Sequence, residues 1–175
     1  MADKTFEELF IDELKDIHDA ESRIVKALPK MIRGASSKEL STALKDHLGQ
    51  TEEHVARLDR ALEQLDETSG KKACEAMKGL LEEAEELLQE SNDPAVKDAA
   101  IIAAAQKVEH YEMATYGTLR EWARQLGYDD IASTLQKTLD EEEMADKKLT
   151  LISESRNYQP RYQRKTATFG PRTHY

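Results

Sequence analysis

Acidic side chains and histidines occupy positions on the apolar stripes of this sequence where core residues are expected. Burying an unpaired carboxylate in an apolar interior is costly, so several such groups in one interior require a compensating positive charge. Carboxylate and imidazole ligands together suit iron and manganese. The candidate metal ligands are Glu21, His47, His54, Glu109, Glu112, Glu142 and Asp146. Taken singly, each could instead be a solvated residue at a stripe edge or a hydrogen-bonded core residue.

Three of these candidates come together if the chain reverses direction near residues 34–36, where Gly-Ala-Ser breaks the helical pattern. Two antiparallel helices folded about that point set Glu21 level with Gln50. His47 and His54 then lie one helical turn to either side of this level. The first helical pair therefore offers a carboxylate and imidazoles at mid-height.

A second reversal, near Gly127, brings the other candidates to the same height. It sets Glu109 level with Asp146 and Glu112 level with Glu143. A pair of bound cations would explain how several acids share one interior, because the metal charge removes the repulsion between them. The two helical pairs together therefore predict a carboxylate-rich metal site inside a bundle.

Five stretches with apolar residues at helical spacing must position these groups. They cover residues 4–33, 37–67, 74–90, 94–125 and 128–154. Ser36, three residues before Glu39, predicts a capping box at the second stretch, and Asp93 before Pro94 predicts the start of the fourth. The sequence therefore predicts an all-α fold, a four-helix bundle with a shorter crossover helix between two helical hairpins.

Residues 156–175 differ in composition from the helical part. They hold five basic and four aromatic side chains and no acidic one, and Pro160, Gly170 and Pro171 exclude a continuous helix. We expect two regions, a bundle of residues 1–155 and a basic, aromatic C-terminal tail of residues 156–175. Such a tail can dock on an acidic surface of its own chain or of a second subunit, and binding to a polyanion is the alternative.

The overall charge disfavours several classes of partner. With 25 basic and 35 acidic residues the net charge is −10, which repels nucleic acids and anionic membranes. Cys74 is the only cysteine, so an internal disulfide is excluded and a reducing compartment fits. The N-terminus lacks the pattern of an export signal, and no apolar stretch is long enough to span a membrane. We therefore expect a cytoplasmic protein.

The stretch 97–112, with the sequence KDAAIIAAAQKVEHYE, resembles the YciF-type ferritin-like stress proteins of bacteria. Further segments that resemble this family are 19–21, His47-Leu48 with Thr51, 72–77, 116–119 and 138–142. Together they span residues 6–152, nearly the whole chain except the tail. The resemblance implies a bundle of the ferritin and rubrerythrin kind, a di-iron site, a role in stress response and a homodimer.

The resemblance also implies roles for the candidate ligands. Glu21 would be a terminal carboxylate, Glu142 would bridge, and Asp146 would bind a metal or orient a ligand. The remaining ligands would be His47 or His54 from the first pair, with Glu109 and Glu112 from the second. Iron is the expected metal, and manganese is the alternative.

The sequence departs from the ferritin-like ligand pattern, in which two helices each contribute Glu-x-x-His. Neither the second nor the last stretch contains that motif, and Gln50 stands where a bridging carboxylate is expected. A single metal, or two metals bound with unequal affinity, therefore remains open beside a full di-iron centre. His110 is expected outside the ligand sphere, and Tyr111 and Tyr116 are expected to pack near it.

Two functions fit these observations. A metal-dependent redox protein would remove peroxide or dioxygen, or handle iron, during stress. Alternatively, a stress-induced structural or interaction protein would keep a degenerate or empty metal site, as the missing Glu-x-x-His motifs suggest. A mineral-storing cage is less favoured, because the resemblance points to dimers.

Overall fold

The computed structural model describes residues 3–90 and 92–155, and this part of the chain is helical without any strand. Its helices are α1 (Phe6–Gly34), α2 (Lys38–Gln64), α3 (Glu75–Gln89), α4 (Pro94–Gln125) and α5 (Asp129–Glu154). The all-α prediction is therefore confirmed. The predicted tail, residues 156–175, lies outside the described residues.

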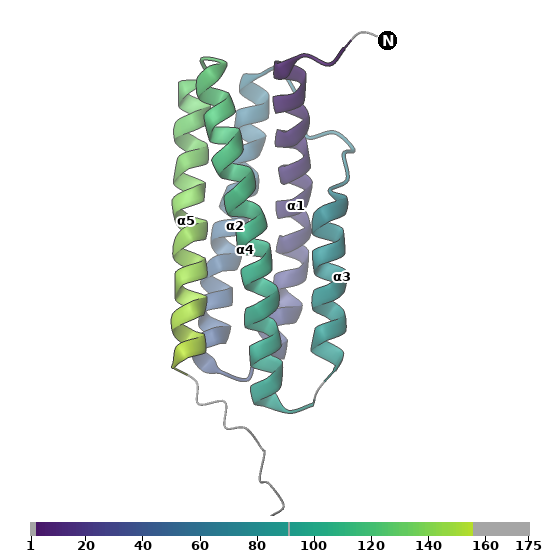
Figure 1. Cartoon of the computed structure of the whole chain (residues 1–175), viewed down its shortest axis with the longest axis vertical. Coiled ribbons are helices and arrows are strands. Elements are labelled where there is room, and N and C mark those ends of the chain that lie inside the picture. The colour runs from purple at the N-terminus through teal and green to yellow at the C-terminus, as the bar shows by residue number, and fades with distance from the viewer. Residues whose placement is uncertain (1–2, 91, 156–175) are drawn as a thin grey trace, which may run out of the picture.

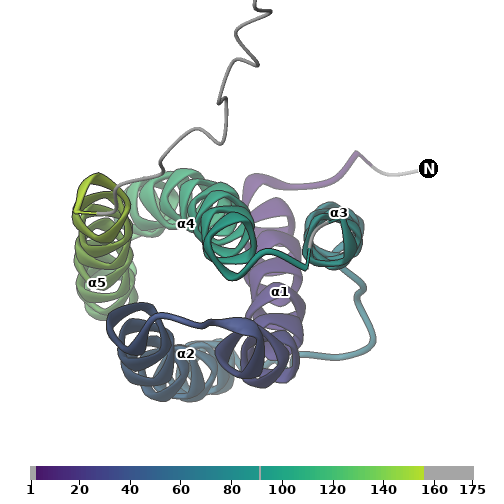
Figure 2. The same cartoon turned by 90° about the horizontal axis from the view of Figure 1, so that it is seen from below.

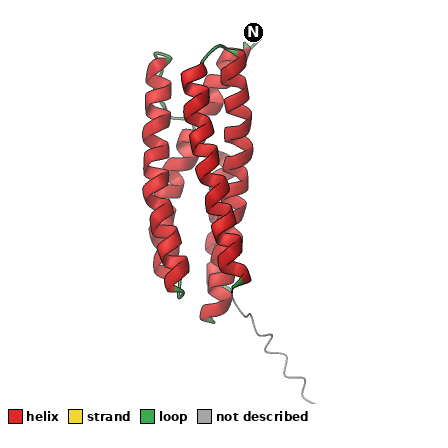
Figure 3. Cartoon of the chain, turned by 90° about the vertical axis from the view of Figure 1, so that its left-hand side faces the viewer, coloured by secondary structure: helices red, strands yellow, loops and turns green. Residues whose placement is uncertain are grey.

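The four long helices run along one axis and surround a common interior (Figures 1 and 3). Viewed along that axis, α1, α2, α5 and α4 follow one another around the bundle, and α3 lies outside it (Figure 2). The short helix α3 packs mainly against α4 and α1. This is the predicted pair of helical hairpins with a crossover helix between them.

Local sequence signals set the ends of the helices. Asp93 caps α4, with its side chain accepting a hydrogen bond from the Ala95 N–H, and Pro94 opens the helix as predicted. Gly127 has a φ of 81° in the turn after α4, a conformation that costs a glycine little and that reverses the chain toward α5.

Ser37, and not Ser36, caps α2, because its hydroxyl accepts the hydrogen bond from the Leu40 N–H. Ser36 is engaged elsewhere, since its hydroxyl donates to the carbonyl oxygen of Pro94. The capping box predicted from Ser36 and Glu39 is therefore wrong by one residue.

The bundle core consists of the apolar stripes that the helical spacing predicted. Its largest fully buried side chains include Phe10, Leu14, Ile17, Leu40, Leu58, Leu62, Ile101, Leu119, Leu135 and Ile152. None of the described helices is long and apolar enough to cross a membrane. The polar candidates interrupt this core at mid-height, where apolar layers close it on both sides.

A buried aspartate joins the two hairpins. Asp98 of α4 is fully buried, and its carboxylate accepts hydrogen bonds from the N–H groups of Ser36 at 2.8 Å and Ser37 at 3.0 Å. These two donors belong to the turn between α1 and α2. Asp98 therefore fixes the height of α4 relative to the first hairpin, and with it the level of the site.

We predict that Asp98→Ala lowers the free energy of unfolding by about 1.5–3 kcal/mol, the cost of removing a charged acceptor from buried donors. Urea denaturation followed by circular dichroism measures this loss. Asp130→Ala is the matched control, because Asp130 is an exposed acid at the start of α5. An equal, small effect of both substitutions would contradict the role given to Asp98.

Candidate metal centre

Six of the seven candidate ligands converge in the bundle interior from four helices. Glu21 comes from α1, His47 and His54 from α2, Glu109 and Glu112 from α4, and Glu142 from α5. Each is at most 6% exposed. The histidines are seven residues apart and the α4 glutamates three, spacings that place side chains on one face of a helix.

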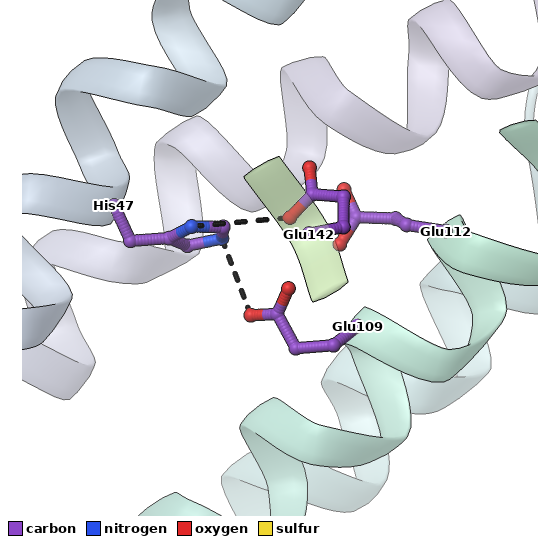
Figure 4. A group of neighbouring side chains, drawn as sticks. All are labelled: His47, Glu109, Glu112 and Glu142. Carbon is purple, nitrogen blue, oxygen red and sulfur yellow. Dashed lines mark ion pairs between the residues drawn. The ribbon is translucent and has the colours of Figure 1, made fainter. Parts of the chain in front are cut away.

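The first group of ligands consists of His47, Glu109, Glu112 and Glu142 (Figure 4). His47 Nε2 lies 3.3 Å from Glu109 Oε1, and His47 Nδ1 lies 4.0 Å from Glu142 Oε2. One donor atom from each residue lies within 4.8 Å of all the others. Because a cation about 2.0–2.2 Å from its ligands holds them within about 4.4 Å of one another, small side-chain movements would complete the coordination.

The second group consists of Glu21, His54 and Glu142. His54 Nδ1 lies 2.8 Å from Glu142 Oε1 and 3.5 Å from Glu21 Oε1. Glu142 belongs to both groups, with one oxygen toward each histidine. The two groups are therefore adjacent positions that share a carboxylate.

Most of these donor atoms have no hydrogen-bond partner. Among the described residues, the buried side-chain polar atoms without one all belong to these six residues, except for Arg120 Nε. Both oxygens of Glu112 and both nitrogens of His47 are in this set. Glu142 Oε1 and His54 Nδ1 are also in it, although they form an ion pair at 2.8 Å. Buried polar atoms are nearly always paired in folded proteins, so this concentration indicates a ligand that satisfies them.

The protein environment shifts the pKa values of these groups in opposite directions. Burial, and then the charge of Glu142, raises the pKa values of Glu109 and Glu112 well above 4.5. Burial acts the same way on Glu142, but His54 and His47 outweigh it and lower the pKa of that carboxyl. Burial alone would lower the pKa of His54, yet Glu142 and Glu21 raise it to about 10. Without metal, protons therefore neutralise part of the site.

A second layer of side chains orients His54. Glu141 Oε2 lies 2.9 Å from His54 Nε2, and the same carboxylate accepts two hydrogen bonds from the Arg57 guanidinium at 2.6 and 3.1 Å. Arg57 also donates to Thr138. A carboxylate on the outer nitrogen of an imidazole turns the other nitrogen toward a metal and raises its basicity. Nδ1 of His54 accordingly faces Glu21 and Glu142.

Tyr116 supports the first carboxylate of the site. Its fully buried hydroxyl donates a hydrogen bond to Glu21 Oε1, which leaves Oε2 without a partner. Burial and the charge of Glu21 raise the pKa of Tyr116 well above its usual value. Tyr116 therefore remains a hydrogen-bond donor that holds Glu21 in place.

The structure does not bring Asp146 into either group. Its carboxylate accepts a hydrogen bond from Gln106 at 3.1 Å and lies 3.5 Å from Nδ1 of His110, an exposed residue. Gln50 is also exposed and lines a groove between α2 and α5. Asp146 lies four residues after Glu142 and points to the outer edge of the α4–α5 contact.

The sequence interpretation missed Arg57 and Glu141. Neither residue is among the candidates that the sequence predicted. The available signal was the spacing of Arg57, three residues after His54 on the same stripe as Leu58 and Leu62. A buried arginine requires a carboxylate partner, but the sequence does not identify which of many acids supplies it.

Comparison with known proteins gives consistent matches. The chain matches a family described as "Domain of unknown function (DUF892)" over residues 5–160. It is 46% identical to "Protein YciF" of Escherichia coli over 148 residues, 84% of this chain and 89% of that protein.

Solved structures are similar as well. The crystal structure of the E. coli stress protein YciF has a TM-score of 0.83 and 44% identity, over 87% of this chain and 96% of that one. A protein of Rhodopseudomonas palustris, described as a putative structural protein, has a TM-score of 0.81 and 46% identity, over 83% of this chain and 93% of that one. A Xanthomonas campestris protein, 21% identical with a TM-score of 0.65 over 86% of this chain and 95% of that one, shares the fold.

We predict that Glu112→Gln stabilises the metal-free protein at pH 8, because a neutral amide avoids the cost of burying an ionised carboxylate or of keeping the carboxyl protonated at that pH. Burial raises the pKa of Glu112 above 4.5, so the folded chain holds this proton to higher pH than the unfolded chain. The free energy of unfolding therefore falls as the pH rises above 4.5 toward the folded-state pKa.

Urea denaturation at pH 5 and pH 8, with a chelator present, measures both effects. The stability of the Glu112→Gln protein should fall less between the two pH values than that of the parent. Glu143→Gln, at an exposed position on α5, serves as the control and should behave like the parent. A Glu112→Gln protein with the parental pH dependence would refute the assignment.

Proposed function

We propose that this chain, which belongs to the DUF892 family, is a relative of the stress protein YciF that binds two divalent metal ions and uses them to remove peroxide or dioxygen. Iron is the metal that we favour, with manganese as the alternative. The similarity to a stress protein is shown by the comparisons, and the chemical activity is what the proposal adds. It depends on the interior arrangement of four carboxylates and two imidazoles.

The observation that carries the proposal is the set of unpartnered donor atoms in the buried interior. Four ionised glutamates carry four negative charges, and two neutral imidazoles add none. Two divalent cations supply four positive charges, so the loaded site has no net charge. A buried site without net charge avoids the large desolvation cost that the carboxylates alone would incur.

The ligand types support iron. Ferritin-like di-iron proteins use one glutamate from each of two helices and Glu-x-x-His from each of two others, which amounts to four glutamates and two histidines. The same inventory occurs here, although both histidines come from α2 and α4 contributes Glu109 and Glu112. Imidazole ligands disfavour magnesium and calcium, which prefer oxygen alone.

A pair of ferrous ions, when bound, would supply two electrons that, with two protons from the solvent, reduce one hydrogen peroxide to two waters and leave two ferric ions. The chain contributes the surroundings of that reaction. Glu142 holds the two positions next to each other, and Arg57 with Glu141 keeps His54 oriented. His47 and Glu109 line the groove between α2 and α5, which gives a small oxidant a route to the first group.

A structural role is the second candidate, favoured by the description of the R. palustris relative as a putative structural protein. In that case protons and the histidines would neutralise the buried carboxylates, and the site would bind no metal. Metal content distinguishes the two candidates directly. A purified chain that contains no iron or manganese, and takes up neither under anaerobic conditions, would support the structural role and end the redox proposal.

We predict that the six ligands separate into two sets in a metal titration. Glu142→Gln should remove or weaken both cations, because Glu142 belongs to both groups. His47→Ala should affect one equivalent and His54→Ala the other. Calorimetry with ferrous ions, or absorption spectroscopy with cobalt, counts the equivalents. Glu143→Gln is the control, and a Glu142→Gln chain that binds two cations with parental affinity would contradict the shared carboxylate.

We also predict that metal loading releases protons from Glu109, Glu112 and His54, because ligands must lose their protons to bind. Because the pKa values of these groups are raised, protons compete with the metal for them, and the affinity for metal falls as the pH falls. Calorimetry in buffers of different ionisation enthalpy measures the number. Loading without proton release would show that the site is not the one described.

The proposed activity is tested with the ferrous-loaded chain. It should consume hydrogen peroxide with a stoichiometry of about one peroxide for each pair of ferrous ions, which is the two-electron balance. The Glu142→Gln chain should lose this activity, whereas Glu143→Gln should keep it. Peroxide consumption that is equal in the loaded and metal-free chains would refute the redox function.

A further inference from the structure

A groove between α2 and α5 opens over the first ligand group. Its volume is about 460 Å³, within the range of roughly 300–1,000 Å³ that small-molecule sites occupy. Glu109 lines it although that residue belongs to α4, so the groove reaches past its two flanking helices into the bundle interior. The groove therefore connects the surface with the site.

The walls of the groove are largely apolar. Met144 is 68% exposed and Leu151 is 65% exposed, which makes them two of the few large apolar side chains that the described residues expose. Apolar surface gathered in a concavity is typical of a site for an apolar ligand. The apolar residues that line the groove are Ala43, Leu44, Met144, Ala145, Leu149 and Leu151.

The charged side chains of the walls are already paired or solvated. Lys148 Nζ lies 3.1 Å from Asp46 Oδ2, and the Glu141 carboxylate accepts two hydrogen bonds from Arg57. Lys147, whose side chain is 72% exposed, keeps its charge in water. The walls therefore attract neither an anion nor a cation strongly, and they fit a neutral ligand.

The floor of the groove is polar and lacks hydrogen-bond partners. His47 is 6% exposed and Glu109 is 2% exposed, and His47 Nε2 lies 3.3 Å from Glu109 Oε1. Neither nitrogen of His47 has a hydrogen-bond partner, nor does Glu109 Oε2. A neutral group that carries an O–H can pair such atoms without adding charge. The groove therefore fits a ligand with an apolar body and one neutral, oxygen-bearing end.

We propose that the groove binds an alkyl hydroperoxide, with the O–O group beside His47 and Glu109 and the alkyl chain along the apolar walls. This inference rests on the proposed function and names the class of peroxide that the site reduces. On α5 the lining residues run from Glu141 to Leu151, about 15 Å of helix. A chain of eight carbons, at about 1.2 Å for each bond of an extended chain, spans about 9 Å and fits this length.

The reaction breaks the O–O bond and converts the hydroperoxide to the corresponding alcohol and one water. It consumes two electrons and two protons. The two ferrous ions of the proposed function supply the electrons and become ferric, and the solvent supplies the protons. The apolar walls then hold an alcohol of the same chain length, which leaves through the open side of the groove.

Binding is tested on the full chain without metal, with octanol as an unreactive analogue of octyl hydroperoxide. Isotope-labelled methionine methyl groups report the contact by NMR spectroscopy. The Met144 signal should shift to saturation, whereas the signals of Met31 and Met77, which are buried in the core, should stay in place. Hexanol should bind more weakly than octanol, by about two- to fourfold for each CH₂ removed, because each methylene leaves apolar surface exposed.

Groove variants locate the binding. Ala145→Trp should weaken octanol binding about tenfold or more, because the indole occupies the space of the ligand. Leu151→Gln changes an exposed residue, which leaves the fold intact, and should weaken binding severalfold. Ala114→Trp, at an exposed position on α4 outside the groove, is the matched control and should bind octanol like the parent.

The substrate class is tested with the ferrous-loaded chain. Octyl hydroperoxide should be reduced faster than ethyl hydroperoxide, which carries the same reacting group on a shorter chain. Ala145→Trp should lower the ratio of the rates with octyl hydroperoxide and hydrogen peroxide by about the factor that it costs in octanol binding. Ala114→Trp should leave this ratio unchanged.

The outcomes separate this inference from the proposed function. A Met144 signal that octanol does not shift, or equal octanol affinity in the parent and both groove variants, would overturn the inference while reduction of hydrogen peroxide could still stand. Octanol binding without reduction of any peroxide would refute the proposed function, and the substrate class with it. A Met144 signal that moves on dilution of the protein alone would assign the groove to a second copy and would also overturn the inference.

Discussion

Four carboxylates inside one buried interior are the constraint on which this structure depends. A low-dielectric core tolerates them only if protons, histidines or metal ions neutralise them. The pKa directions indicate how the metal-free chain meets this requirement, because the raised pKa values of Glu109, Glu112 and His54 favour their protonated forms and the lowered pKa of Glu142 favours its charged form. The same groups, without their protons, form the proposed ligand set.

The fold was largely predictable because each helix carries its own signals. Apolar spacing, the Asp93-Pro94 start and Gly127 are local features, and local features define where helices begin and end. The resemblance read from stretch 97–112 is confirmed by the match to the DUF892 family and to YciF. The error at Ser36 arose because its hydroxyl donates to a residue of another helix, the carbonyl oxygen of Pro94.

The site was predictable in its residue types but not in its detail. Counting residues from each turn identified which residues of two antiparallel helices lie at the same height. The structure brings six of the seven candidate ligands together. Whether a side chain on a given level points inward depends on the rotation of each helix, which a level alone does not give. Asp146 and Gln50 are at the expected height but on other faces, and the partners Arg57 and Glu141 are set by contacts across helices.

The origin of both histidines on α2 has an evolutionary consequence. Since both nitrogen ligands belong to α2, mutations confined to that helix can replace the histidines by residues with oxygen ligands, while the glutamates on α1, α4 and α5 stay unchanged. The result would be an oxygen-only cage, which selects harder cations than iron. Descendants of such a bundle could therefore diverge in metal preference, or lose metal altogether, through a single segment of the gene.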